Sequence, residues 1–585
     1  MNTMIFSTTI FKKSRGWMDL VKKFEEFNYT RPEFEDIEQK FGQALAHFTG
    51  AKSVNEQSEA MKSINEIRNK VGTMMNIVYV RNSIDTNDEF YKAERDYLDE
   101  LSPKVDDLIT KYYRALVSSA FRHELEVKWG TQLFAIAEAQ IKSFSSEVIP
   151  LMQQENKLSS EYQQLIASAK IDFENEERTL AQMQPFTEST DRDMRKKAKE
   201  AYFSFFAENE DQLDRIYDDL VKVRTEIAHT LGYENFVELG YYRMIRTDYD
   251  ATMVKKFRDQ VKEFIVPLAT KLKERQQQRI GVDDFKYYDE SFNYKTGNAT
   301  PKGSPEWIIE GGKKMYDELS VETSEFFDFM IDNNLMDLVA KKGKASGGYC
   351  TYIEDYKAPF IFSNFNGTSG DIDVLTHEAG HAFQVYSSRH FEIPEYNWPT
   401  FESCEIHSMS MEFLTWPWME NFFKEDTDKY KFSHLSNSLE FLPYGVAVDE
   451  FQHFIYENPE ATAAERKLAW KEVEEKYLPH RDYDGNDYLN RGGFWQRQGH
   501  IYQSPFYYID YTLAQICAFQ FFKRTLENRE EAWADYVHLC NIGGSLSFTG
   551  LVKEANLTSP FEDGCVESVI GPIEQWLNSI DDKAL

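Results

Sequence analysis

Cysteine is scarce in this sequence, which has only 5 in 585 residues, widely spaced and odd in number. Such a pattern is typical of free thiols rather than of a disulfide framework, and it indicates a reducing compartment. Long hydrophobic runs are also lacking: nothing approaches the roughly 20 apolar residues that span a bilayer, and even the segment 516–522 contains Gln520. The N-terminal apolar stretch precedes its basic residues, so it makes a poor signal peptide. We therefore expect a cytoplasmic protein.

Positive charge is in short supply as well. The chain has 66 Lys and Arg against 98 Asp and Glu, a net charge of −32. A field of that sign repels phosphate backbones and anionic lipid headgroups, so we expect no nucleic-acid and no membrane partner. Hydrophobic residues nevertheless make up 42% of the chain and aromatic residues 15%. This is far too much apolar surface for a disordered chain, and it predicts a globular protein.

Helix-forming residues dominate two long parts of the chain. From 55 to 280 the sequence is rich in Glu, Lys, Ala, Leu and Gln with few breakers, and the helical pattern returns from Asp371 almost to the end. An aromatic and glycine-rich loop is expected at 491–504. Within 106–149 we expect the buried stripe of a packed helix, because apolar residues recur at mostly three- to five-residue steps: Leu108, Ile109, Tyr112, Leu116 and Phe121.

Between the two helical parts the composition changes. Gly, Asn, Asp and Pro accumulate there among aromatic and β-branched residues, which predicts loops with a small sheet. Its expected strands lie in 347–355 and 359–369. A Pro and several cap-type residues at 183–193 predict a boundary near residue 190. The expected fold class is therefore mainly α with a minor β-sheet.

One string has a spacing that indicates metal chemistry. HEAGH at 377–381 matches H-E-x-x-H inside a helical segment that begins near Asp371. Positions i and i+4 of a helix share a face, so His377 and His381 can reach one zinc ion while Glu378 addresses its water. Zinc lowers the pKa of that water to about 7, and a carboxylate beside it can take the proton as hydroxide attacks a carbonyl.

A catalytic zinc site uses three protein ligands and keeps its fourth position open, so a third ligand is needed. A histidine at the longer H-E-x-x-H-x-x-G-x-x-H spacing is excluded, because Ser387 stands in its place and Gln384 replaces the glycine. Glu402 and Glu405 follow His381 by 21 and 24 residues and lie one helical turn apart. By spacing alone, either carboxylate can complete the set.

The segment 405–412, EIHSMSME, resembles the E-x-x-S-x-x-x-E segment of the thimet oligopeptidase and oligoendopeptidase F family of zinc peptidases. HEAGH at this distance upstream is similar to the metal helix of that family. The resemblance selects Glu405 as the third ligand of one zinc ion per chain, and it implies that Glu412 orients a ligand imidazole. Asp373, one turn before His377, is expected either to serve similarly or only to favour the helix dipole.

The resemblance continues at 491–522, which is similar to the family's loop and helix that carry a histidine and tyrosines over the substrate. His500 and Tyr511 are the nearest matches, and Tyr508 is the next candidate. A phenol donates to a developing oxyanion at neutral pH, and such a donor is worth about 3 kcal/mol of barrier. For Tyr507 we expect a place in an aromatic core stripe instead.

Similarity to the family spans at least 190–575, whereas the first 190 residues match only in helical character. The resemblance implies two helical lobes around a deep substrate channel, with an N-terminal lobe at 1–190 and a catalytic region at 191–585. It also implies that Gly347 and Gly348 lie on a substrate-facing strand, where the missing Cβ lets a peptide backbone approach.

The sequence thus predicts a zinc-dependent oligoendopeptidase that hydrolyses internal bonds of short peptides. Glu378 is the expected general base, and His500 with Tyr511 or Tyr508 is expected to stabilise the tetrahedral intermediate. Two alternatives stay open. One is a metallo-carboxypeptidase or dipeptidase, which needs a charged group that captures a peptide terminus. The other is a non-catalytic peptide-binding helical scaffold, although structural zinc sites use four protein ligands and have no use for a base.

Overall fold

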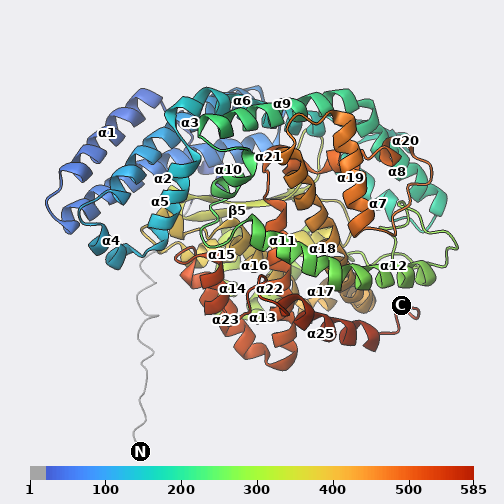
Figure 1. The fold of residues 1–585 in the computed structure, drawn as a ribbon. Helices are drawn as coiled ribbons and strands as arrows, with labels where there is room; N and C mark the ends of the chain where they lie inside the picture. The colour runs from blue at the N-terminus through green and yellow to red at the C-terminus, as the bar shows by residue number, and fades with distance from the viewer. Residues whose placement is uncertain (1–21) are drawn as a thin grey trace, which may run out of the picture.

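The computed structural model describes residues 22–585, and Figure 1 shows how their helices and strands are arranged. The N-terminal stretch that makes a poor signal peptide lies outside these residues. Helices account for 70% of the residues and strands for 4%, which confirms the expected mainly α fold. None of the helices within 22–585 combines the length and the apolar character needed to cross a membrane.

The three-stranded sheet divides the helices into two groups along the chain. Before the sheet they are α1 (Phe34–Gly50), α2 (Val54–Ile84), α3 (Glu89–Val117), α4 (Arg122–Trp129), α5 (Gln132–Ser143), α6 (Ile149–Ala167), α7 (Leu180–Thr187), α8 (Arg192–Glu208), α9 (Glu210–Thr230), α10 (Phe236–Arg243), α11 (Ala251–Gln260), α12 (Val266–Ile280), α13 (Pro305–Leu319) and α14 (Val321–Asp332). After it they are α15 (Gly370–Ser388), α16 (Phe401–Leu414), α17 (Glu420–Phe423), α18 (Thr427–Glu457), α19 (Ala463–Tyr477), α20 (Asp487–Asn490), α21 (Gly499–Gln503), α22 (Tyr508–Glu527), α23 (Arg529–Ile542), α24 (Phe548–Glu554) and α25 (Cys565–Ser579).

Two hydrophobic cores hold these helices together. Buried side chains of α1, α2, α3, α4 and α5 form the smaller core, which also includes Ile393 and Tyr396 from much later in the chain. These helices lie at one end of the molecule in Figure 1, in blue. Tyr396 ties the two regions together, because its hydroxyl donates to the carbonyl of Trp129 at 2.7 Å. The lobe division expected near residue 190 stays a prediction; α7 and α8 lie on either side of it.

Two stretches differ from the sequence expectation. The stripe expected over 106–149 spans three helices rather than one, because α3 ends at Val117 and α4 ends before Gly130. Gly130 has a φ of 91°, a conformation that favours glycine and breaks the helix. The segment 491–504 is not a plain loop either. It contains α21 and the 3-10 helix η9 (Phe494–Arg497).

A two-stranded hairpin interrupts the long helical region and was not expected. β1 (Ile171–Phe173) pairs antiparallel with β2 (Glu176–Arg178). The two residues between the strands, Glu174 and Asn175, have φ of 51° and 63°, as the tight turn of a two-residue hairpin requires. Each strand has only three residues and β2 consists of charged residues alone, so neither stands out in a search for apolar, β-branched runs.

The three-stranded sheet confirms both expected strands and adds a third. β4 (Tyr349–Ile353) and β5 (Ala358–Phe365) are antiparallel neighbours, and β3 (Met336–Val339) pairs parallel with β5. The order β3-β5-β4 places β5 in the centre, where nearly all its side chains are buried, and leaves β4 at an edge. Helix α15 packs directly on this sheet. The small sheet therefore lies next to the H-E-x-x-H segment, as expected.

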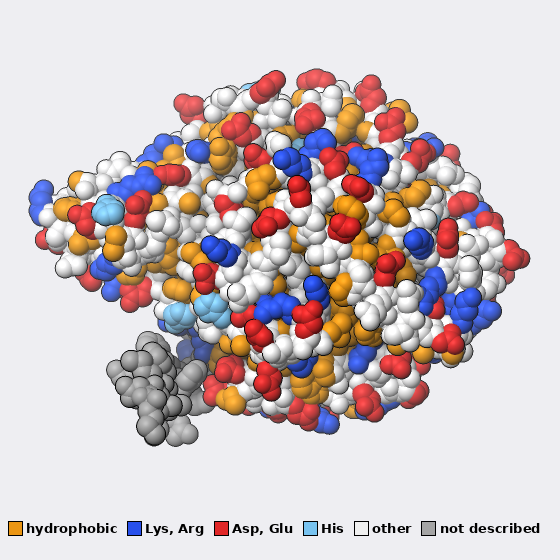
Figure 2. All heavy atoms as spheres, turned by 60° about the horizontal axis from the view of Figure 1, so that its bottom comes forward, with side chains coloured by type: hydrophobic (Ala, Val, Ile, Leu, Met, Phe, Trp, Pro, Cys, Tyr) orange, Lys and Arg blue, Asp and Glu red, His pale blue; other side chains and the backbone are white. Residues whose placement is uncertain are grey.

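The cysteines and the surface agree with the composition. All five cysteines are free, as their spacing predicted; four are buried and Cys350 is half-buried. Figure 2 shows acidic and basic side chains interspersed with apolar ones over the face in view. That face offers no extended basic area for a phosphate backbone.

Helices α15 and α16 approach each other very closely at one glycine. A Cβ placed on Gly380 would lie 2.7 Å from the carbonyl oxygen of His407 and 2.7 Å from Cα of Ser408, which are both backbone atoms of α16. Backbone atoms cannot move aside as a flexible side chain can, so only glycine allows this contact. Most side chains of α16 are buried, and this helix also packs on α22.

We expect Gly380→Ala to destabilise the fold, because the added methyl group pushes α16 away from α15. Overpacking of this kind costs about 1–3 kcal/mol of unfolding free energy. Gly42→Ala is the matched control: Gly42 is exposed inside α1, with nothing within 4 Å of the added Cβ. That change should stabilise by about 0.5–1 kcal/mol. Denaturant unfolding measures both, and a Gly380→Ala variant as stable as its parent contradicts the contact.

Candidate active site

Helix α15 carries the H-E-x-x-H residues, and the preceding chain favours its start. Asp371 in the first turn accepts backbone hydrogen bonds from Asn366 at 2.8 Å and from Gly367 at 2.9 Å. Its negative charge also suits the positive end of the helix dipole. The expected start of the helix near this residue is thus confirmed. The rings of His377 and His381, one turn apart, have their centroids 5.1 Å from each other.

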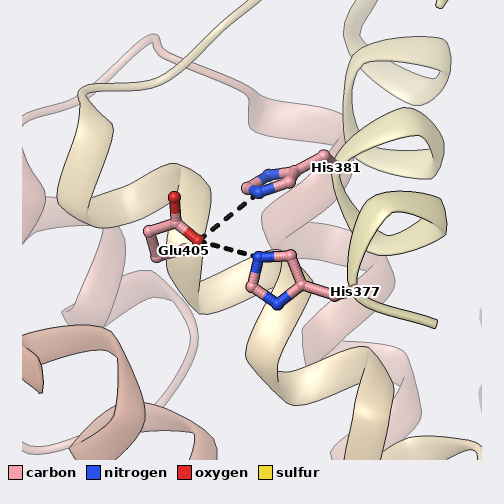
Figure 3. A group of neighbouring side chains, drawn as sticks. All are labelled: His377, His381 and Glu405. Carbon is pink, nitrogen blue, oxygen red and sulfur yellow. Dashed lines mark ion pairs between the residues drawn. The ribbon is translucent and has the colours of Figure 1, made fainter. Parts of the chain in front are cut away.

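Glu405 on α16 completes a group of three side chains that could hold a metal ion. Its Oε2 lies 3.2 Å from Nε2 of His377 and 3.4 Å from Nε2 of His381. The three ligand atoms all lie within 4.8 Å of one another, and Figure 3 shows both rings pointing toward the carboxylate. Two imidazoles and one carboxylate form a donor set found in catalytic zinc sites. Glu402, the other carboxylate that spacing allowed, is buried outside this group.

The carboxylate of Glu405 is held from several sides. Ser408 donates its hydroxyl to Oε2 at 2.9 Å, and Tyr507 donates its hydroxyl to Oε1. Burial alone would raise the pKa of Glu405, but His381 and His377 hold this pKa well below its usual range. Glu405 is therefore an anion at neutral pH, as a metal ligand must be. Tyr507 lines the cavity, which corrects the core position expected for it.

Glu412 lies behind His377, two turns after Glu405 on the same helix. It accepts a hydrogen bond from Nδ1 of His377 at 2.8 Å, which leaves Nε2 of that ring facing Glu405. A carboxylate in this position fixes the orientation of a ligand imidazole. Asp373 takes a different partner, because it accepts the hydroxyl of Tyr430 at 2.7 Å. Burial raises the pKa of Asp373 to about 6.

Glu378 lines the cavity beside the three ligands. Its Oε2 is buried and has no hydrogen-bond partner among residues 22–585. Burial raises the pKa of this carboxyl, which brings its proton affinity closer to that of a base acting at neutral pH. Gly348 leaves room for it: a Cβ there would lie 3.3 Å from Oε1 of Glu378 and 3.1 Å from Val374. Gly347, with a φ of 88°, precedes it in the turn before β4.

His500 and Tyr511 meet at another side of the cavity. Nε2 of His500 lies 3.1 Å from the hydroxyl of Tyr511, and its Nδ1 lies 2.8 Å from the amide nitrogen of Gln498. An amide N–H only donates, so His500 carries its proton on Nε2 and donates to Tyr511. Burial lowers the pKa of His500 to about 4 and raises the pKa of Tyr511 well above its usual value. At neutral pH the imidazole is uncharged and the phenol is protonated.

Tyr508 does not join this pair. Its ring packs edge-on against His500 at 5.1 Å, Tyr444 at 5.7 Å and Phe441 at 5.8 Å between centroids. It is absent from the described residues that line the cavity, whereas Tyr511 is among them. Of the two predicted tyrosines, the structure therefore brings only Tyr511 to the ligands' cavity.

One cavity of about 600 Å³ is lined by His377, His381 and Glu405, and also by Glu378, His500, Tyr507 and Tyr511. The edge strand β4 forms one wall, and residues from α2, α5 and the start of α16 form others. The lining residues beyond His377, Glu378, His381 and Glu405 include Tyr79, Ile136, Ile245, Gly348, Tyr349, Cys350, Thr351, Pro394, Glu395, Trp398, Pro399, Thr400, Phe401, Cys404, His500, Ser504, Tyr507 and Tyr511.

Comparison with known families decides what kind of protein carries this site. Residues 185–569 match the model of peptidase family M3, and residues 24–144 match that of the peptidase M3 N-terminal domain. The chain belongs to peptidase family M3. Its sequence resemblance to oligoendopeptidase F is confirmed. The N-terminal match goes further than the sequence analysis, which found only helical character in that part.

Curated relatives and solved structures agree with this assignment. The M3 peptidase is 24% identical to an oligoendopeptidase F homolog of Borreliella burgdorferi, over 70% of this chain and 72% of that protein. It is 21% identical to oligopeptidase PepF of Bacillus subtilis, over 87% of this chain and 79% of that protein. A solved structure of PZ peptidase A with an inhibitor has a TM-score of 0.95 and 68% identity, over 96% of this chain and 100% of that chain.

Sequence reasoning missed several polar partners of the M3 peptidase site. Ser408 stands inside the E-x-x-S segment, so the serine of that pattern was the signal for it. Tyr430, His434 and Gln498 gave no such signal, because they come from segments with no fixed spacing to the ligands. Tyr507 is 102 residues from Glu405. Contacts of this kind appear only once the helices are packed.

We expect Tyr507→Phe to weaken zinc binding by the M3 peptidase about tenfold, because Glu405 loses the phenol that holds one of its oxygens. Tyr508→Phe is the matched control, since it removes a hydroxyl from the next residue, whose ring packs on His500 instead. Competition with a chromogenic chelator measures both zinc dissociation constants. If the zinc dissociation constant is unchanged in Tyr507→Phe, or if Tyr508→Phe loses as much zinc affinity, the Tyr507 hydroxyl does not support Glu405 as a ligand.

Proposed function

We propose that this M3 peptidase is a zinc-dependent oligoendopeptidase that hydrolyses internal bonds of short peptides. The proposal rests above all on one observation: Nε2 of His377, Nε2 of His381 and Oε2 of Glu405 converge beside a buried carboxyl with an unpartnered oxygen. These three ligands fit one zinc ion and leave a coordination position open. When bound, zinc supplies Lewis-acid chemistry, which polarises a carbonyl and lowers the pKa of water.

Glu378 is the group that moves the proton. Its Oε2 is free of protein partners and lies in the same cavity as the ligands. It accepts a proton from the water that attacks the scissile carbonyl and then gives this proton to the leaving amine. Its pKa, raised by burial, suits both halves of that exchange.

Tyr511 is the oxyanion donor that the geometry favours. Its oxygen accepts the N–H of His500, so its own proton is left for an acceptor in the cavity. The negative oxygen that forms in the tetrahedral intermediate is such an acceptor, and one donor of this kind is worth about 3 kcal/mol. His500 acts by orienting the phenol, and Gln498 fixes the tautomer that lets it do so.

Peptide binding is assigned to the edge strand β4. An extended peptide can add to an exposed strand edge through main-chain hydrogen bonds. Gly348, Tyr349, Cys350 and Thr351 of this segment all line the cavity. The missing Cβ of Gly348 lets a substrate backbone come close to Glu378. Short, unfolded peptides are therefore the substrates that we propose, in line with the oligopeptidase names of the relatives.

Cleavage within the peptide is favoured over removal of its ends. A carboxypeptidase or dipeptidase needs a charged group to capture a peptide terminus. The described residues that line the cavity include no Lys or Arg for a carboxylate. Glu395, a carboxylate that could pair with an amino terminus, is already engaged by Arg68 at 2.7 Å and by the hydroxyl of Tyr113.

Two further features support an enzyme in the cytoplasm. A structural zinc site uses four protein ligands, whereas the group found among residues 22–585 has three. This argues against the non-catalytic scaffold. The five free thiols suit a reducing compartment.

We expect Glu378→Gln to keep its zinc and to lose peptidase activity, with kcat/KM lowered by about 10²- to 10⁴-fold. Glu402→Gln is the matched control. Glu402 is a buried carboxyl of α16 that lies outside the group of His377, His381 and Glu405, and burial raises its pKa well above its usual value. Peptide hydrolysis and bound zinc are measured on both variants. Parental activity in zinc-loaded Glu378→Gln would rule out this residue as the base.

A further inference from the structure

A row of hydrogen bonds runs from His377 away from the cavity. Beyond the bond from His377 to Glu412, the second oxygen of Glu412 lies 2.8 Å from Nε2 of His434 on α18. Nδ1 of His434 in turn lies 3.2 Å from Nε1 of Trp416, in the 3-10 helix η7 (Trp416–Trp418). Hydrogen bonds thus join four side chains from α15, α16, η7 and α18.

The indole of Trp416 and the carboxylate of Glu412 fix which atom donates in every hydrogen bond of this row. An indole N–H only donates, so Nδ1 of His434 must accept from Trp416. His434 then carries its proton on Nε2 and donates it to Glu412. The carboxylate of Glu412 only accepts, so His377 must hold its own proton on Nδ1. Nε2 of His377, which lies 3.2 Å from Oε2 of Glu405, is then the nitrogen that would offer a lone pair to a metal ion.

The row is buried, so water does not compete for these bonds. Trp416 is 7% exposed and His434 is 6% exposed. The ring of Phe413 packs against both, with centroids 5.4 Å from Trp416 and 4.9 Å from His434. Tyr430 covers another side of His434 at 5.5 Å. Neither ring can turn away without losing this packing.

We propose that Trp416 and His434 are positioning residues, which hold the Glu412 carboxylate where it accepts from Nδ1 of His377 and so present Nε2 of His377 to the metal. The inference rests on the zinc site of the proposed function. Without His434, Glu412 loses the donor to its second oxygen and is free to rotate away from His377. Without Trp416, His434 loses the donor that anchors its Nδ1, so its Nε2–H is held less firmly toward Glu412. Both changes act on metal binding from outside the ligand group.

The test measures zinc affinity rather than activity alone. His434→Met removes both nitrogens at similar volume, and we expect the zinc dissociation constant to rise about 10- to 100-fold. His434→Gln keeps a donor for Glu412 and an acceptor for Trp416, so it should restore most of the affinity. Competition with a chelator gives the zinc dissociation constants. The visible spectrum of the cobalt-loaded protein should shift in His434→Met and stay unchanged in His434→Gln.

Tryptophan variants separate the hydrogen bond from packing. Trp416→Phe removes the indole N–H and should weaken zinc binding about tenfold. Trp470→Phe is the matched control, because Trp470 is fully buried in α19 and its Nε1 has no partner among the described residues. It should lose stability in the same way but keep the parental zinc dissociation constant. Thermal unfolding of the metal-free proteins shows whether both variants are folded.

The row of hydrogen bonds from Trp416 through His434 and Glu412 to His377 is called the relay below. Different results would overturn the relay and the proposed function. If the parent binds zinc and both His434→Met and Trp416→Phe bind it equally well, the relay is wrong and the zinc site stands. Equal weakening in Trp416→Phe and Trp470→Phe also overturns the relay, since the effect is then one of packing. If His434→Met does not fold, the tryptophan pair decides. A parent that binds no zinc overturns the proposed function, and the relay with it.

Discussion

The contact of α15 with α16 at Gly380 is the constraint on which the site depends. Gly380 lies between the two histidines of HEAGH, and it touches the backbone of α16 just after Glu405. A single close approach thus sets how far the histidines lie from the carboxylate and which turn of α16 faces them. The remaining structure supports this crossing: β5 and β4 lie against α15, and α22 packs along α16. The second helix pair also brings Tyr507 and Tyr511 to the same cavity.

Three glutamates near this crossing differ because their surroundings differ. Glu405 faces two imidazoles, and its pKa lies well below the usual range. Glu412 accepts N–H bonds from His377 and His434, which lower its pKa against the effect of burial. Glu378 has neither a donor on Oε2 nor a lowered pKa, since burial raises it. These different surroundings suit the three roles that we propose for one side-chain type: a ligand, an orienting group and a base.

Local patterns predicted the parts of the site that depend on local geometry. His377, Glu378 and His381 share one helix, where the i, i+4 spacing alone brings two rings to one face. Glu405 lies on another helix, so spacing left Glu402 equally open and only the family resemblance chose between them. The hairpin was not predicted because its strands have three residues each and β2 is wholly charged. His434 was not predicted because its partner Glu412 lies 22 residues away on another helix. Gln498 was not predicted because it lies in an irregular segment, where no helical or strand periodicity indicates which side chains meet.

Cleavage of a short, internally quenched peptide blocked at both ends tests the central claim most directly. The account predicts internal cleavage that a chelator abolishes and that added zinc restores. Cleavage of only the free-ended counterpart would contradict it in favour of an exopeptidase. Failure to cleave either peptide, with zinc bound, would contradict catalysis altogether and favour a peptide-binding scaffold.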